Sequence, residues 1–365
     1  MRRHWQKKPL LVRGALPEYA DLVDPSALQR LAQRDDVVSR LVMRVGERWQ
    51  VLHGPFTRAQ LRRLPARGWS LLVQGVDHVL PRAGALLREF GFLPYARLDD
   101  VMVSYAPPGG GVGPHFDSYD VFLLQRAGER RWRTSAQRDL ALVPDAPLRI
   151  LQRFRPQREW TVRPGDLLYL PPHHAHDGVA VSDCITISVG FRAPSAAEVI
   201  GRFLDHLQDT VSAEGIYADP ELEPARHPAK IGDDMLRKFA RMLAAIRWTD
   251  RDVGEFAGRY LTEPKQHVVF ARPAQPMTRS AFGRAVSRHG VRLALNTAML
   301  FHGTVFFING DSHRVSATSA RLLRRLADRR LLQPPLTCDT ECLELLHEWY
   351  RAGYLHPDAN PEKTP

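Results

Sequence analysis

The chain has 365 residues, of which 44% are hydrophobic and 25% charged, as is ordinary for a globular protein of two or three domains. No apolar run is long enough to span a bilayer, the apolar stretch Pro9–Val12 is too short for a signal-peptide core, and three cysteines cannot form the disulfide framework of an exported domain. We therefore expect a cytoplasmic protein. The formal net charge of +11 fits attraction to nucleic acid and, equally, an arginine-rich composition without any polyanionic partner.

The first part of the chain, up to about residue 195, is expected to form a β domain. Between residues 18 and 95, the helical spacing of the leucines predicts helices that decorate a sheet. Beyond residue 95, short apolar runs alternate with turn signals such as Arg163–Asp166, which is typical of an all-β sandwich or barrel. The predicted strands are Val101–Tyr105, Val121–Leu124, Leu167–Leu170 and Ile185–Val189.

From Pro194 onward the hydrophobic period changes to that of helices. Three amphipathic stripes follow, with Ser195 and Thr249 as predicted N-caps of the first and third helix. Three helices in about 65 residues bury little core of their own. We therefore expect this region to pair with a second copy of itself in a homodimer, although packing on the β domain is the alternative.

The last part of the chain combines helices with a small hairpin. Thr278 is expected to open a helix, strands are expected at 293–300 and 304–308, and Asn309-Gly310 is a hairpin turn signal. Two further helices follow, the second of which ends at Gly353. This layout is typical of a winged-helix unit, which binds nucleic acid in some proteins and contacts only other proteins in others.

The predicted organisation is therefore an α+β protein of three domains. A β domain is expected at residues 1–196, a helical dimerisation domain at 197–265 and a winged-helix-like domain at 266–365.

A metal site is suggested by two histidine-containing stretches. In an extended chain His115 and Asp117 face the same side, so both can reach one ion. The stretch Pro171–His176 presents three more histidines directly after a predicted strand. Two imidazoles and one carboxylate bind one face of an octahedral ion and leave three positions open, which is the ligand set of non-haem Fe(II) oxygenases.

Arg130, which follows the first histidine stretch in the sequence, is a candidate for binding a co-substrate. Successive side chains of a strand point to opposite faces. Arg130 and Trp132 are therefore expected to face inward. Arg131 and Arg133 are expected to face solvent. A guanidinium near such a metal can hold a carboxylate by two parallel hydrogen bonds. The far carboxylate of an iron-bound 2-oxoglutarate needs such a partner.

These motifs resemble those of the bacterial JmjC-type ribosomal oxygenases, over about residues 10 to 230. The similar stretches are His115–Gln125, Arg130–Arg133, Pro171–Gly178, Ser188–Pro194, Tyr217–Pro220 and Ala225–Pro228.

The resemblance implies a double-stranded β-helix of the jelly-roll, cupin or JmjC type, followed by a helical dimerisation domain and a winged-helix domain. It implies a protein hydroxylase that uses Fe(II), 2-oxoglutarate and molecular oxygen, and whose target is an arginine of a large-subunit ribosomal protein. His115, Asp117 and His176 become the metal ligands, the last because Asp177-Gly178 follows it, and Arg130 becomes the 2-oxoglutarate ligand. Ala106 departs from the pattern, because it stands where a hydroxyl residue of the co-substrate pocket is implied.

Asp120 and Tyr119 are the candidates for contact with a substrate arginine, as a carboxylate and a flat wall close to the metal. Three alternatives stay open: hydroxylation of histidine, demethylation by the same fold, and a non-catalytic metal-binding adaptor in ribosome assembly. Whether the protein also contacts nucleic acid stays open.

Overall fold

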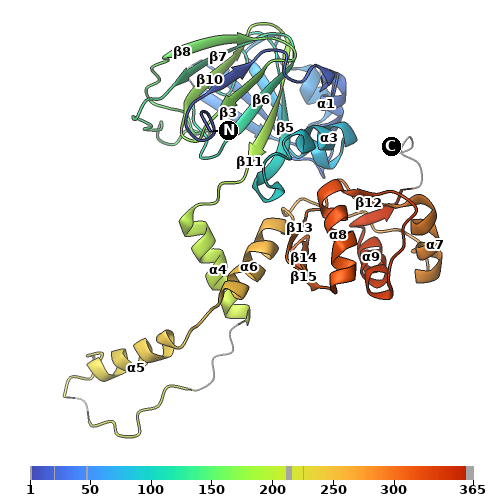
Figure 1. The fold of residues 1–365 in the computed structure, drawn as a ribbon. Coiled ribbons are helices and arrows are strands. Elements are labelled where there is room, and N and C mark those ends of the chain that lie inside the picture. Colours follow the sequence, from blue (N-terminus) through green and yellow to red (C-terminus); the bar gives the residue numbers. More distant parts are fainter. Residues whose placement is uncertain (1, 20, 47, 211–215, 225, 359–365) are drawn as a thin grey trace. The chain divides into compact units, whose positions relative to one another are not determined.

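A computed structural model describes residues 2–19, 21–46, 48–210, 216–224 and 226–358 (Figure 1). Ala225 of the family-like stretch and the outermost residues of the first and last predicted domains lie outside these ranges. The chain forms two compact units: the first contains Met1–Ala193, Pro264–Ala298 and Ala317–Pro365, and the second contains Pro194–Glu263 and Met299–Ser316. The three domain boundaries expected from the sequence stay a prediction.

The first unit is built around an eight-stranded sheet and a three-stranded sheet. The large sheet has the antiparallel order β1-β9-β6-β11-β5-β4-β2-β3, and the small one has the order β10-β7-β8. The strands of the large sheet are β1 (Leu10–Val12), β2 (Ser39–Val45), β3 (Arg48–His53), β4 (Trp69–Val73), β5 (Leu98–Ala106), β6 (Val121–Ala127), β9 (Leu167–Leu170) and β11 (Cys184–Phe191). Those of the small sheet are β7 (Arg130–Ser135), β8 (Arg158–Val162) and β10 (Ala175–Ala180).

Short helices cover one side of the large sheet, where Figure 1 shows α1 and α3 beside β5. Their apolar faces join one continuous core with Leu71, Val103 and Ile187 of the sheet. These helices are η1 (Pro17–Tyr19), α1 (Pro25–Leu31), α2 (Arg58–Arg62), η2 (Val76–His78), α3 (Pro81–Glu89) and η3 (Tyr95–Arg97).

The leading segment is richer in strands than its sequence predicts. Helices occur at Leu28 and Leu61 as expected, but β2, β3 and β4 also join the large sheet. All five residues of β4 are buried, so its sequence carries no alternation of apolar and polar residues. Short runs of this kind cannot be assigned to strand or helix from periodicity alone.

The first unit also contains a group of C-terminal helices with a small sheet of order β16-β12-β17. Phe282, Leu346 and Trp349 lie at most 1% exposed in this part of the molecule. Thr278 caps α7 and Gly353 ends α9 in a left-handed conformation, both as expected. The elements are α7 (Arg279–His289), β12 (Val291–Leu293), α8 (Ala317–Arg329), β16 (Leu331–Leu332), α9 (Thr340–Ala352) and β17 (Leu355–Pro357).

In the second unit, the described residues form three helices and a hairpin sheet of order β13-β14-β15. Ser195 and Thr249 accept hydrogen bonds as the predicted N-caps. Its elements are α4 (Ala196–Thr210), α5 (Asp233–Ala244), α6 (Asp250–Thr262), β13 (Met299–His302), β14 (Val305–Ile308) and β15 (Asp311–Arg314).

The expected strand at 293–300 is wrong. Leu293 ends β12 and Met299 begins β13, and these two strands belong to different sheets. The chain between them turns at Thr297, whose hydroxyl donates to the carbonyl of Tyr354 and whose N–H donates to that of Ala294. Asn309-Gly310 does form a hairpin turn, with φ of 50° and 93°, and it leads into the unpredicted strand β15.

Candidate functional site

A cavity of about 610 Å³ lies between the eight-stranded sheet and the sheet β10-β7-β8 of the first unit, which together we call the β body. Residues from β2, β4, β5, β6 and β11 line one side, and residues from β7 and β10 line the other. His115, Asp117, His176 and Arg130 all line it, so the structure brings the predicted metal and co-substrate residues together.

Two backbone hydrogen bonds join the two metal-binding stretches. The N–H of His115 donates to the carbonyl of His176 at 2.9 Å, and the N–H of His176 donates to the carbonyl of His115 at 2.8 Å. This isolated antiparallel bridge fixes the two histidines opposite each other although they are far apart in the sequence.

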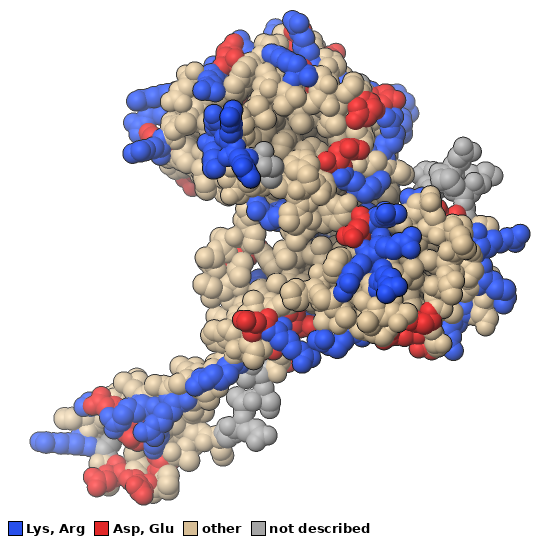
Figure 2. All heavy atoms as spheres, viewed as in Figure 1, with Lys and Arg blue, Asp and Glu red and all other residues tan. Residues whose placement is uncertain are grey.

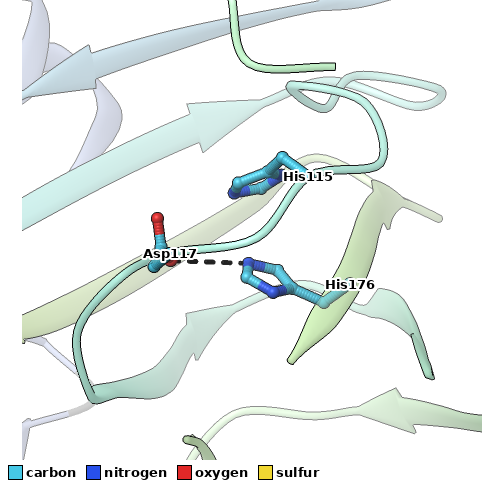
Figure 3. A group of neighbouring side chains, drawn as sticks. All are labelled: His115, Asp117 and His176. Atoms are coloured by element: carbon cyan, nitrogen blue, oxygen red, sulfur yellow. Dashed lines mark ion pairs between the residues drawn. The ribbon is translucent and has the colours of Figure 1, made fainter. Parts of the chain in front are cut away.

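The side chains of His115, Asp117 and His176 point toward one common centre (Figure 3). One ligand atom from each lies within 4.8 Å of the others. His176 Nε2 lies 3.6 Å from Asp117 Oδ2, and the two imidazole centroids are 4.2 Å apart. This is a spacing that a single ion can bridge.

The backbone also selects the nitrogen that each imidazole offers. His115 Nδ1 lies 2.8 Å from the carbonyl oxygen of Gly113, and His176 Nδ1 lies 2.8 Å from that of His174. A carbonyl accepts only from a protonated Nδ1, so the lone pair of each neutral ring lies on Nε2. Burial, with a contribution from His115, lowers the pKa of His176 to about 4, which keeps this ring neutral and able to bind a metal.

The other two histidines of Pro171–His176 have structural contacts instead. The N–H of His173 donates to the carbonyl of Asp117 at 2.7 Å, and its ring packs against Phe116. His174 supplies the carbonyl that orients His176. Within the part of the chain that the structure describes, neither side chain joins the group of potential ligands.

The residues after His176 hold β10 against β7. The buried carboxylate of Asp177 pairs with Arg133, its cross-strand partner. A Cβ at Gly178 would lie 2.5 Å from the ring of Trp132, so only glycine lets the two strands approach at this point. The acid and the glycine of this motif therefore position His176, which precedes them.

Arg130 is a buried cation that lines the cavity. Arg130 and Trp132 are each 5% exposed, which confirms that they lie on the inward face of β7 as predicted. Arg130 Nη1 donates to Ser104 Oγ at 3.5 Å, while Nε and Nη2 have no hydrogen-bond partner among the described residues. An unpaired buried guanidinium is unfavourable, and a ligand carboxylate would satisfy the free N–H groups by two parallel hydrogen bonds.

A hydroxyl group lines the cavity two residues before Ala106. Ala106 is fully buried against Ala180 and Cys184 and does not line the cavity. Ser104 lies on the same strand, lines the cavity and touches Arg130. The departure at Ala106 therefore does not leave the pocket without a hydroxyl group.

Two acidic side chains that the sequence did not single out also line the cavity. They are Asp99 and Asp100, and Lys265 Nζ lies 3.0 Å from Asp99 Oδ1 and 3.3 Å from Asp100 Oδ2. Burial raises the pKa of Asp100, and Lys265 opposes this shift only in part. Tyr119 lines the same cavity, and its role as a substrate wall stays a prediction.

Asp120 is not brought to this cavity. Its side chain is fully buried, and Tyr169 donates to its carboxylate at 2.6 Å, Gln6 at 3.0 Å and Arg97 at 3.4 Å. Those contacts satisfy the acid and tie the N-terminal segment to the β body. The suggested role of Asp120 in substrate binding stays a prediction that this placement does not favour.

The donor set fits Fe(II) and 2-oxoglutarate. Two imidazoles and one carboxylate suit Fe(II), and the cavity that they line has room for further ligands. The unpaired N–H groups of Arg130 suit the carboxylate of a small dianionic co-substrate.

Known proteins share both the domains and the fold. Residues 85–199 match the model of the JmjC domain, and residues 245–356 match that of the ROXA-like winged helix.

Individual relatives agree with these matches. The ribosomal protein uL16 3-hydroxylase of Escherichia coli (strain K12) is 36% identical over 277 residues, which are 76% of this chain and 74% of the relative. A probable ribosomal oxygenase of Haemophilus influenzae is 40% identical over 229 residues, which are 61% of this chain and 54% of the relative. The structure of YcfD, a ribosomal oxygenase from Escherichia coli, in complex with cobalt and 2-oxoglutarate has a TM-score of 0.83 at 31% identity and covers 97% of this chain and 96% of that one.

Proposed function

Because the chain belongs to the bacterial JmjC-type ribosomal oxygenases, we propose that it hydroxylates an arginine side chain of a large-subunit ribosomal protein. It is a 2-oxoglutarate-dependent oxygenase that uses Fe(II) and molecular oxygen and modifies a ribosomal protein.

His115, Asp117 and His176 are the proposed Fe(II) ligands, and Arg130 is the proposed partner of the far carboxylate of 2-oxoglutarate. When bound, the metal and co-substrate supply the oxidative chemistry that leaves one oxygen atom of O₂ on a substrate carbon, with succinate and carbon dioxide as by-products. Arg130 orients the co-substrate, Ser104 offers a hydroxyl beside it, and the buried ring of Trp132 keeps water from that wall.

The arginine is supported by the acids of the cavity. Asp99 and Asp100 line the cavity and share one lysine, Lys265, so we infer that these two carboxylates can also pair with a cationic side chain of the substrate. Met102 and Tyr119 line the same space and offer an apolar and an aromatic wall for the flat guanidinium. The single observation that carries the choice of arginine is the buried carboxylate of Asp100 in the cavity of the metal ligands.

Mass spectrometry of ribosomal proteins tests this function directly. Ribosomes from cells with and without the gene are compared by intact mass, and a protein that loses the mass of one oxygen atom is then sequenced by fragmentation. We expect one protein of the large subunit to change, with the oxygen on an arginine. An oxygen on histidine would reject the arginine. The adaptor alternative would be favoured by two results together. The masses of all ribosomal proteins would be unchanged, and the purified protein would bind metal but not 2-oxoglutarate.

Two further proposals concern the whole molecule. We propose a homodimer formed through the second unit, whose α5 exposes Leu236, Phe239 and Leu243. We also propose a cytoplasmic location, because the ribosomal protein that it modifies is made there. No helix among the described residues is both long enough and apolar enough to cross a membrane.

A further inference from the structure

Helix α8 carries a one-sided set of positive charges. Its exposed side chains include four arginines and one acid, Asp328. The arginines are Arg321, Arg324, Arg325 and Arg329, and we call them the α8 arginine face. Figure 2 shows Lys and Arg side chains gathered over the segment that Figure 1 labels α8.

The opposite face of α8 anchors the helix. Leu323 and Leu326 are fully buried, and Ala320 and Ala327 are nearly so. Arg321, Arg325 and Arg329 therefore lie on the exposed side of the helix, away from this buried face. Among the residues that the structure describes, the guanidinium groups of Arg321, Arg325 and Arg329 make no ion pair.

The spacing of these arginines is unfavourable for an isolated helix. Arg321, Arg325 and Arg329 follow one another at four-residue intervals, which places their Cβ atoms about 5–6 Å apart. Like charges at this spacing repel and destabilise a helix by roughly 0.2–0.5 kcal/mol per pair. A polyanion with regularly spaced charges would reverse the sign of that interaction.

We propose that the α8 arginine face binds the phosphate backbone of RNA. Arginine forms paired hydrogen bonds with phosphate oxygens, and a row of arginines follows a strand of phosphates without reading its bases. No aromatic residue lies among the exposed side chains of α8, so base stacking is not part of this contact. The choice of RNA among polyanions rests on the proposed function, since a ribosomal protein substrate is assembled among ribosomal RNA.

Fluorescence anisotropy of the full chain with a fluorescein-labelled RNA stem–loop, titrated at several KCl concentrations, tests the proposal. The variants are R321E/R325E and the uncharged R321Q/R325Q. The matched control is R58E/R62E, which changes two exposed arginines at the same four-residue spacing on α2. Circular dichroism establishes that each variant is folded.

We expect R321E/R325E to bind the RNA at least about tenfold more weakly than the native protein, and R58E/R62E to bind within about twofold of it. R321Q/R325Q should lower the slope of log affinity against log salt by about 1.4–1.8, because two phosphate contacts are lost. Equal losses in the R58E/R62E control would overturn the proposal. So would a native protein that binds phosphatidylglycerol vesicles through this face but not the stem–loop.

Hydroxylation of the isolated substrate protein, without RNA, separates this inference from the proposed function. R321E/R325E should hydroxylate that protein at the native rate, since α8 contributes nothing to the cavity lining. Native hydroxylation without any RNA binding rejects the α8 inference alone. RNA binding that depends on α8, with no ribosomal protein hydroxylated, rejects the proposed function alone.

Discussion

At the scale of single residues, buried polar groups of this protein divide into those with partners and those without. Asp120 is fully satisfied by Tyr169, Gln6 and Arg97, which is the pattern of a structural residue. Arg130 and Ser70 line the cavity with buried polar atoms that lack partners among the described residues. Such atoms are unfavourable in a folded protein, so we expect them to be satisfied by a ligand.

Replacement of Asp117 by alanine should abolish Fe(II) binding and turnover together. The two histidines would remain, but the anionic ligand of the set would be lost. Isothermal calorimetry with Fe(II) under anaerobic conditions and a 2-oxoglutarate decarboxylation assay measure the two effects. Asp139→Ala, at an exposed acid paired with Arg153, is the control. Decarboxylation retained by Asp117→Ala would contradict the assignment of the ligands.

Replacement of Arg130 by lysine should raise the KM for 2-oxoglutarate about tenfold, because lysine keeps the charge but loses the planar fork; this corresponds to ~1.4 kcal/mol. Alanine should raise it further, since the co-substrate carboxylate would stay unpaired. Fe(II) affinity should not change in either variant. Arg131→Lys, on the exposed face of β7, is the matched control. An unchanged KM in Arg130→Ala would mean that another group binds the co-substrate.

Asp100→Asn should weaken binding of the substrate protein and leave binding of 2-oxoglutarate unchanged. Loss of the buried carboxylate removes a charge-assisted partner of the substrate arginine, so its KM should rise about tenfold. The KM for 2-oxoglutarate should stay at the native value. Steady-state kinetics with the substrate protein measure both constants, again with Asp139→Asn as control. If the substrate constant is native, Asp100 does not recognise the cation.

At the scale of elements, local turns and caps determine where the functional side chains lie. The turn at Arg163–Asp166 has Gly165 at φ of 88° and a hydrogen bond from the N–H of Asp166 to the carbonyl of Arg163. It leads into β9, which ends where the histidine stretch begins. In the second unit, Thr249 fixes the start of α6, because it forms a reciprocal capping box with Asp252.

Thr249→Ala should destabilise the second unit by about 1 kcal/mol, since the N3 backbone N–H loses its side-chain acceptor. Urea unfolding at a fixed protein concentration measures this loss. Thr249→Ser keeps the hydroxyl group and should remain near native stability. Equal losses in both variants would show that the methyl group of Thr249, and not the cap, provides the stability.

At the scale of the whole molecule, the second unit exposes an unusual amount of apolar side chain. Leu236 is 52% exposed and Leu243 is 68% exposed, and both lie on α5. Phe203 instead packs against Phe256 and Trp248 within the unit. The outer apolar residues are thus the better candidates for contact with a second copy.

Leu236→Glu combined with Leu243→Glu should convert the proposed dimer to a monomer, because it buries charge at the contact. Light scattering at micromolar concentration measures the mass. Arg241→Ala, at an exposed polar position of the same helix, should remain a dimer. A native protein that is monomeric at that concentration would contradict the proposed dimer.

Local patterns in the sequence were sufficient to predict several features. Short-range rules placed His115 with Asp117 and Arg130 with Trp132, because alternation along a strand decides which side chains share a face. The helices of the second unit and their caps at Ser195 and Thr249 were predicted for the same reason, since helical period and capping depend on neighbours only.

The remaining features depend on contacts between distant parts of the chain, which no local pattern contains. The backbone bridge between His115 and His176 brings the two histidines together, and the pairing of β4 with β5 places Ser104 in the cavity. Asp100 lines the cavity, and Asp120 does not, because of how strands and the N-terminal segment pack. The sequence by itself determined which chemical groups are available, and the tertiary structure decided which of them meet, because strand pairing joins residues whose separation along the chain is large.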